Sequence, residues 1–83
     1  MKLRRTDGAV LGTYAVGNVP RSVTFDGQNI WVSNAYSGDV TKLRPSDGSL
    51  LGTYPVGSFP EYLAFDGVNV WVANGGSNNV MKR

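Results

Sequence analysis

Short apolar runs, rich in β-branched and aromatic residues, alternate along the chain with clusters of Gly, Pro, Asn and Asp about every ten residues. This pattern predicts short antiparallel strands, because no apolar segment has the length and period of an amphipathic helix. In the best-defined stretch, the expected strands cover residues 21–25, 30–33, 40–44 and 50–56.

The residues between these strands have turn-forming chemistry. The glycines that follow Asp26, Asp47 and Asp66 can adopt the positive φ that tight hairpins require. Pro20 and Pro60 have no N–H to donate to a strand ladder, so we expect them where a strand begins.

The chain repeats itself. A shift of 40 positions aligns residues 2–43 with residues 42–83, and 22 of these 42 positions are identical. "FDGQNIWVSN", which begins at Phe25, returns as "FDGVNVWVAN", which begins at Phe65. A repeat of this length made of short strands indicates the four-stranded antiparallel blade of a β-propeller. We therefore expect an all-β fold in which residues 1–83 form a single two-blade unit, with repeat 1 at about residues 2–41 and repeat 2 at about residues 42–81.

The strands "NIWVSN" and "NVWVAN" carry apolar residues on both faces, which predicts burial on both sides of the sheet. The middle strands of a blade meet this condition, because each blade lies between two others. Aromatic residues are expected to pack between blades and between copies of the chain, and these are Phe25, Phe65, Trp31, Trp71, Tyr14 and Tyr54.

The motifs P-x-x-x-x-F-D-G and N-x-W-V-x-N, with the rest of each repeat, resemble bacterial propeller repeats of the YVTN and NHL type, especially the virginiamycin B lyase-like branch. The resemblance covers essentially the whole chain and implies the propeller fold. The lyase chemistry of that branch is associated with a catalytic histidine and magnesium. Since this chain contains no histidine, the resemblance does not bring that activity with it.

Propellers usually contain four to eight blades, so two blades leave two apolar faces uncovered. Association of copies head to tail into a closed ring would cover them, and it allows only even blade numbers. A trimer with six blades is favoured over a tetramer with eight, because fewer subunits lose less translational and rotational freedom.

The ends of the sequence fall within a repeat, which predicts a blade shared between copies. One chain would supply three strands from residues 61–83, and the next would supply the outermost strand from residues 10–16, paired through the backbone. Residues 1–3 and 81–83 would then compete for one strand position.

The chemistry-bearing residues predict no catalysis. There is no His or Cys, so the usual triads and thiolate metal sites are absent, and the aspartates of the D-G turns are expected to form turns. We expect no cofactor and no metal. A formal net charge of +2 does not by itself favour nucleic acid, and no apolar run suits a membrane span or a secretory signal.

Two surfaces are candidates for binding. The loops that follow the second and fourth strands of a blade should surround the mouth of the central channel, where an unidentified small ligand could bind. The residues expected on this ligand face are Asn18, Arg21, Asn34, Tyr36, Asp39, Ser58, Glu61, Asn74 and Asn79. Tyr36 is the residue to substitute first, because its counterpart in the second repeat is Gly76. It is a candidate anchor for a ligand, although packing within its loop explains it more simply.

The second surface is the outer rim, where basic residues recur at alternate strand positions. They are Lys2, Arg4, Lys42, Arg44 and Lys82. Solvated edge positions that oppose aggregation explain them more simply than a polyanion site does. The sequence thus favours a self-assembling scaffold or binding module without catalysis of its own. A piece or relative of a larger lyase-like propeller enzyme is the first alternative, and a polyanion-binding ring is the second.

Overall fold

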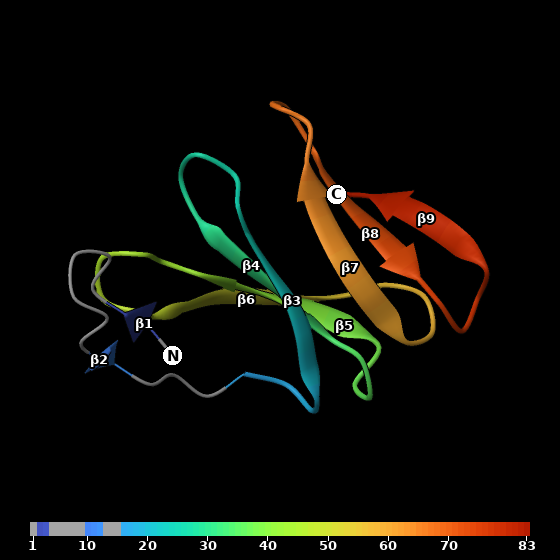
Figure 1. The fold of residues 1–83 in the computed structure, drawn as a ribbon, viewed down its shortest axis with the longest axis horizontal. Helices are drawn as coiled ribbons and strands as arrows, with labels where there is room; N and C mark the ends of the chain where they lie inside the picture. The colour runs from blue at the N-terminus through green and yellow to red at the C-terminus, as the bar shows by residue number, and fades with distance from the viewer. Residues whose placement is uncertain (1, 4–9, 13–15) are drawn as a thin grey trace.

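The computed structural model describes residues 2–3, 10–12 and 16–83 and is built from antiparallel strands (Figure 1). The strands are β1 (Lys2–Leu3), β2 (Val10–Gly12), β3 (Pro20–Phe25), β4 (Ile30–Asn34), β5 (Asp39–Leu43), β6 (Leu50–Pro55), β7 (Pro60–Phe65), β8 (Val70–Asn74) and β9 (Asn79–Lys82). The predicted all-β class and the four predicted strands, now β3 to β6, are confirmed to within two residues at each end. None of the described residues lies in a helix long and apolar enough to cross a membrane.

The strands form three sheets: β1 pairs with β2, β3 to β6 form a four-stranded sheet in sequence order, and β7 to β9 form a three-stranded sheet. The two larger sheets lie next to each other, with β7 nearest the four-stranded sheet and β9 at the far edge (Figure 1). Strands β1 and β2 lie on the opposite side of the four-stranded sheet.

Strand pairing repeats with the sequence. Trp31 of β4 faces Lys42 of β5, and Trp71 of β8 faces Lys82 of β9 in the same register. Strands β3 to β5 are therefore paired in the same way as strands β7 to β9, as the 40-residue repeat predicts.

The motif D-G-x-N-x-W folds as one unit. One carboxylate oxygen of Asp26 accepts hydrogen bonds from the backbone N–H groups of Gln28 and Asn29 at 2.8 and 2.6 Å, and the other accepts the indole N–H of Trp31 at 2.7 Å. Gly27 has a φ of 92°, as predicted for this turn. The aspartate thus closes the hairpin and fixes the tryptophan of the next strand at the same time.

Asp66 makes the same contacts in the second repeat. It accepts the N–H groups of Val68 and Asn69 at 2.8 and 2.7 Å and the indole N–H of Trp71 at 2.7 Å. Gly67 has a φ of 100°. The same contacts form in both repeats, although the two repeats have different surroundings. The arrangement therefore follows from the local sequence.

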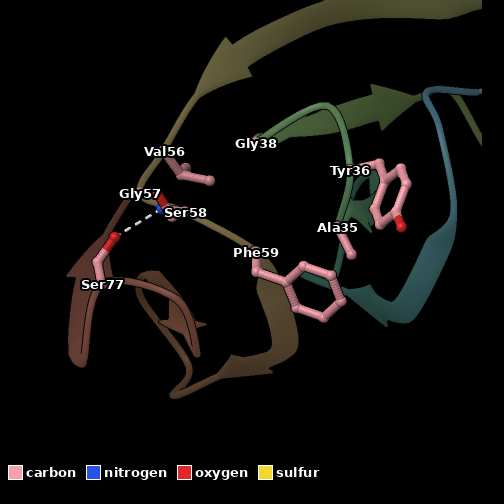
Figure 2. A pocket seen from close by; sticks show the side chains of 8 residues that line it. All are labelled: Ala35, Tyr36, Gly38, Val56, Gly57, Ser58, Phe59 and Ser77. Carbon is pink, nitrogen blue, oxygen red and sulfur yellow. Dashed lines mark hydrogen bonds between the residues drawn. The ribbon is translucent and has the colours of Figure 1, made fainter.

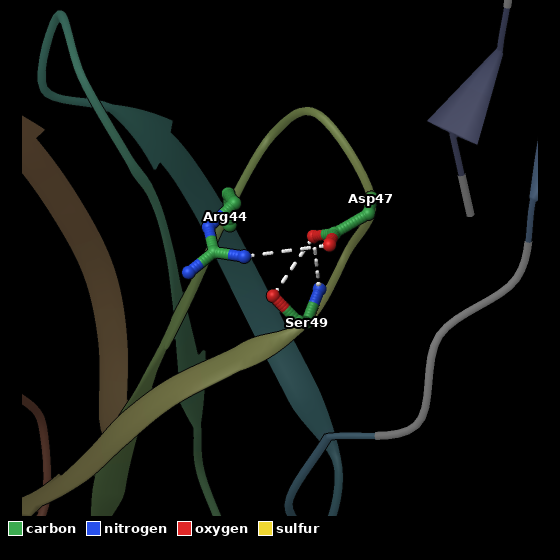
Figure 3. Close-up of polar contacts among 3 residues, drawn as sticks. All are labelled: Arg44, Asp47 and Ser49. Carbon is green, nitrogen blue, oxygen red and sulfur yellow. Dashed lines mark hydrogen bonds and ion pairs between the residues drawn. The ribbon is translucent and has the colours of Figure 1, made fainter.

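The turn between β5 and β6 is held by Asp47 (Figure 3). Its carboxylate accepts the N–H and the hydroxyl of Ser49 at 3.0 and 2.8 Å, and Gly48 has a φ of 71°. Arg44 approaches the same carboxylate at 3.4 Å, but both side chains of this ion pair are more than half exposed, at 52% and 55%. The ion pair therefore adds little to the hydrogen bonds of the turn.

Each sheet has two faces, because successive side chains of a strand point to opposite sides. We call the face that bears the tryptophan the indole face and the other the valine face. The indole faces carry Thr24, Trp31, Val40 and Tyr54 in the four-stranded sheet and Tyr62, Ala64, Trp71 and Val80 in the three-stranded sheet. The valine faces carry Val23, Phe25, Val32 and Leu43 in the first and Leu63, Phe65, Val70 and Val72 in the second.

The core lies where the indole face of the four-stranded sheet packs on the valine face of the three-stranded sheet. Trp31 and Val40 of the first form a buried cluster with Leu63, Val70 and Val72 of the second. Tyr54, Val56 and Phe65 pack against this cluster. The contact joins two different faces, so it is heterologous.

Polar contacts add to this packing at its margins. The hydroxyl of Ser22 accepts the N–H of Leu63 at 3.2 Å, across the two sheets. Arg83 donates to the carbonyl of Pro55 at 2.6 Å, and its guanidinium lies 5.1 Å from the centre of the Tyr54 ring. These contacts fix how the two sheets are placed against each other.

The aromatic residues expected between blades thus have different surroundings within one chain. Trp31 is in the buried cluster, and Tyr54 and Phe65 pack against it, whereas Trp71 and Phe25 are more exposed. Tyr14 lies outside the described residues.

The aspartate of the D-G-x-N-x-W motif has a lowered pKa in both repeats. Hydrogen bonds from the N–H of Asn69, the indole of Trp71 and the N–H of Val68 lower the pKa of Asp66 to about 2, from an ordinary value of 3.8. In the first repeat, burial acts to raise the pKa of Asp26, but the hydrogen bonds from Asn29, Trp31 and Gln28 outweigh it and the pKa is again lowered.

Because the folded-state pKa of Asp66 lies below the unfolded-state value, this carboxylate stabilises the fold fully above pH 3.8 and loses its contribution as the pH falls toward 2. We expect the carboxyl carbon of Asp66 and the indole proton of Trp71 to shift together in an NMR titration, with a midpoint near pH 2. The variant Trp71→Phe, which lacks the indole donor, should raise that midpoint. A midpoint near 3.8 in the unmodified chain would contradict the hydrogen-bonded arrangement.

Candidate functional site

Two kinds of loop meet at one end of the sheets, as the sequence predicted. The loop that precedes β3 is joined to the loop that follows β4, and the loop that precedes β7 is joined to the loop that follows β8. The backbone bonds run from Ala35 N–H to Val19 O, Tyr36 N–H to Asn18 O, Gly75 N–H to Phe59 O and Gly76 N–H to Ser58 O, at 2.9, 3.2, 3.0 and 2.9 Å. In each repeat a serine hydroxyl adds a further bond, from Asn18 N–H to Ser37 and from Ser58 N–H to Ser77, at 2.7 and 2.6 Å.

This loop geometry requires an unusual backbone. Val19 and Phe59, which occupy the same repeat position, have φ angles of 55° and 54°. Side chains of this size rarely adopt positive φ, and the left-handed conformation costs about 1–2 kcal/mol. The conformation turns their carbonyl groups toward Ala35 and Gly75, so the hydrogen bonds between loops offset the strain.

An open depression of about 470 Å³ lies between the loops of the two repeats (Figure 2). Both repeats contribute to its walls, with Ala35 and Tyr36 on one side and Val56 to Phe59 on the other. The residues that line it are Ala35, Tyr36, Gly38, Val56, Gly57, Ser58, Phe59 and Ser77. It is a shallow surface feature and not an enclosed cavity.

Tyr36, Phe59 and Arg21 form a cluster at the edge of this depression. The rings of Tyr36 and Phe59 meet edge to face, with centroids 6.2 Å apart and planes inclined at 62°. The guanidinium of Arg21 lies 5.4 Å from the centroid of Phe59. Tyr36 itself is 76% exposed, so its ring is available to a ligand.

Sequence reasoning selected Tyr36, Arg21 and Ser58 but missed Phe59. The available signal was the residue before the repeated proline, which is Val19 in one copy and the much larger Phe59 in the other. Within the described residues Arg21 is placed on the Phe59 ring, and no ion pair joins it to Glu61.

The prediction that Asn34 and Asn74 lie on the ligand face is wrong. Their exposed fractions are 0% and 1%, so both side chains are buried. Asn34 accepts the N–H of Gly17 at 3.1 Å and donates to Asp39 and Thr41 at 2.9 and 2.8 Å, so it ties three segments together below the loops. The spacing of the sequence could not separate an inward from an outward side chain here, since both lie at the end of a strand.

Asn74 repeats part of this arrangement. Its amide donates to the side-chain carbonyl of Asn79 at 3.0 Å, so Asp39 and Asn79 act as acceptors for the buried asparagines. Met81 replaces the threonine that serves Asn34, and the side-chain oxygen of Asn74 is buried without a hydrogen-bond partner in the described structure. The exposed members of the predicted ligand face are thus Asn18, Arg21, Tyr36, Ser58, Glu61 and Asn79.

Most basic residues of the predicted rim stripe contact other groups of the same chain. Lys42 lies 5.3 Å from the Trp31 ring centroid, and Lys82 lies 5.7 Å from that of Trp71. Lys2 donates to the carbonyl of Pro45 at 3.1 Å. Arg44 contacts Asp47, and Arg4 lies outside the described residues. These contacts give the lysines a packing role beside the tryptophans.

The described part of the chain contains no cluster of three acidic side chains that could hold a metal ion. The aspartates that the structure describes in D-G turns are engaged by backbone and side-chain donors, and their pKa values are lowered, which leaves them poor proton acceptors at neutral pH. The geometry of the loop end is suited to binding through aromatic and backbone groups.

No family model and no curated protein matches the chain. Among solved structures, it is similar to a chain of Kuenenia stuttgartiensis hydrazine synthase, with a TM-score of 0.71 and 26% sequence identity. The match covers 90% of this chain and 23% of that one, so the chain spans about a quarter of the length of this neighbour.

The strain at Val19 can be tested by substitution. Asn tolerates positive φ, and Val19 is partly exposed, so little packing is lost. We expect Val19→Asn to raise the free energy of unfolding by about 1 kcal/mol, measured by denaturant titration at one protein concentration. Val68→Asn, at an exposed position without positive φ, is the control and should change stability by less than about 0.5 kcal/mol. A loss of stability in Val19→Asn would refute the strain.

Proposed function

We propose that the chain is a self-assembling β-propeller scaffold and binding module, whose copies associate head to tail into an even-bladed ring and which has no catalytic activity of its own. The observation that carries this proposal is a difference between equivalent positions. Several residues that one sheet buries against its neighbour have exposed counterparts in the other sheet.

The indole faces illustrate the difference. Trp31 is 8% exposed and its counterpart Trp71 is 38% exposed, while Val40 is fully buried and its counterpart Val80 is 63% exposed. The valine faces show the reverse, since Leu63 is 9% exposed and its counterpart Val23 is 64% exposed. Each chain therefore presents a free indole face on the three-stranded sheet. On the four-stranded sheet it presents a partly free valine face, which is exposed at Val23 and Phe25 and buried at Val32 and Leu43.

A second copy is the partner that these faces fit. The contact between the indole face and the valine face already exists inside the chain, so the free faces are copies of two surfaces that pack together. Two free indole faces would not reproduce that packing. The contact between copies is therefore heterologous, and a heterologous contact either closes into a ring or continues as a filament.

Closure is favoured because exposed apolar faces of this kind are covered completely only in a ring. Two sheets per chain give four, six or eight blades within the usual range of propellers. The trimer with six blades is our first expectation and the tetramer with eight blades the second, since a smaller number of subunits loses less translational and rotational freedom.

Ring closure would gather the loop ends of all subunits around the channel mouth. Each chain would contribute the depression beside Tyr36 and Phe59, with the guanidinium of Arg21 at its edge. Aromatic rings next to a guanidinium suit a ligand with a flat or anionic group. Tyr36 remains the residue to substitute first when a ligand is sought.

One alternative has a specific observation in its favour. The chain corresponds to only 23% of the hydrazine synthase chain that it resembles. It could therefore be one part of a larger enzyme-like propeller, in which further blades of the same polypeptide would cover the free faces. Such a part should be monomeric or should form a mixture of open aggregates when isolated.

Native mass spectrometry and sedimentation of the 83-residue chain distinguish a self-assembling scaffold from a part of a larger propeller. We expect one species of three subunits for the self-assembling scaffold. Val80→Glu places a charge on the free indole face and should weaken association at least about 100-fold, because an unpaired buried carboxylate is strongly unfavourable. Val68→Glu, outside both free faces, is the control and should assemble normally.

Val40→Glu completes this experiment, because it makes the same change at the equivalent position inside the chain. It should unfold the protein, whereas Val80→Glu should remain a folded monomer by circular dichroism. A monomeric unmodified chain at micromolar concentration would contradict the scaffold, and so would normal assembly of Val80→Glu.

A further inference from the structure

Strand β9 has an unpaired edge in the described structure and is built like β5. The four residues of β9 pair with β8 in the same register in which their counterparts in β5 pair with β4. The pairs run from Lys82, which corresponds to Lys42, to Asn79, which corresponds to Asp39. Mutual backbone hydrogen bonds between Val70 and Arg83, at 3.1 and 2.7 Å, extend this pairing by one residue. In the four-stranded sheet, the other edge of β5 holds β6. The equivalent edge of β9 holds no described strand.

Strands β1 and β2 are paired like β5 and β6. Lys2 faces Gly12 and Leu3 faces Val10, as Lys42 faces Gly52 and Leu43 faces Leu50. The irregularity in the ladder also recurs, between Lys2 and Leu3 in one pair and between Lys42 and Leu43 in the other. Strand β2 thus corresponds to β6, and the two residues of β1 correspond to the last two residues of β5.

Strands β1 and β9 are therefore equivalent partners for β2. At the 40-residue offset, Lys2 corresponds to Lys82 and Leu3 corresponds to Arg83. The two partners differ in length, since β1 has two residues and β9 has four. Strand β1 also pairs in an isolated two-stranded sheet, which is the least stable kind, whereas β9 is anchored on β8.

We propose that β1 is an internal competitor for the edge of β2, and that assembly exchanges it for β9 of a second copy. The exchange rests on the self-association proposed above and adds a backbone connection to it. Strand β2 of one copy completes the three-stranded sheet of the next, with Val10 opposite the partner's position 83. An unpaired β edge is a ready template for such addition.

Occupation of the edge by β1 has a consequence for the free chain. While β1 pairs with β2, that edge of β2 is not open to β9 of another copy, so β1 opposes the exchange until it is displaced. A variant that lacks Lys2 and Leu3 should consequently reach half-assembly at a concentration about tenfold lower, since the competing backbone pairs are removed.

Disulfides can fix either pairing, because the chain contains no cysteine of its own. Leu3→Cys with Val10→Cys locks β1 on β2 within one chain. Val10→Cys in one chain and Arg83→Cys in another report the exchanged pair. Leu43→Cys with Leu50→Cys, at the equivalent position inside the four-stranded sheet, is the control for disulfide geometry and for folding.

We expect the oxidised Leu3→Cys/Val10→Cys chain to stay monomeric by native mass and to assemble after reduction. A mixture of the two single variants, Val10→Cys and Arg83→Cys, should give a covalent heterodimer on non-reducing gels. The control pair should form its disulfide within one chain and assemble in both redox states.

Two results would overturn the exchange, and they differ in what they leave standing. If the locked chain assembles as well when oxidised as when reduced, face packing suffices, so the proposed scaffold stands and the strand exchange is wrong. If the unmodified chain is monomeric and the two single variants give no heterodimer, both proposals fail together.

Discussion

The packing of an indole face on a valine face is the interaction on which the rest of the structure depends. It provides the buried cluster around Trp31 and Leu63, which joins the two larger sheets. Because the contact joins two unlike faces, a single chain can satisfy it only once. The same packing that stabilises the chain therefore leaves an uncovered indole face at one side and a partly uncovered valine face at the other.

A local hydrogen-bonded turn places the tryptophan of the indole face in the same way in both repeats. Asp26 and Asp66 close a hairpin turn and hold the indole of the following strand with the same carboxylate. These contacts with the tryptophan do not require the other sheet, since all the partners lie within five residues. Lys42 and Lys82 lie over the two rings from the neighbouring strand. Local order of this kind lowers the entropic cost of building the face that later packs.

The candidate binding site depends on the junction of loops from both repeats. Its framework is repeated, because both copies join their loops through the same backbone hydrogen bonds and the same positive φ angles. Its chemistry is not repeated, because Tyr36 corresponds to Gly76 and Phe59 corresponds to Val19. A ring with this alternation would present aromatic groups at every second blade, while the scaffold beneath stayed uniform.

The sequence by itself determined the strands, the turns and the equivalence of the two repeats, because these follow from local backbone chemistry: glycine after aspartate in tight turns, proline at strand starts, and a period of 40 residues. It identified Tyr36 as an exposed loop aromatic but placed Asn34 and Asn74 on the wrong side of the loops. Only the tertiary structure decided which copy of each face is covered, since Trp31 and Trp71 have nearly the same local sequence and hydrogen bonds but differ in whether a sheet lies against them. Burial is a property of the surroundings of a residue, so positions that are identical in the two repeats do not by themselves reveal which copy is covered.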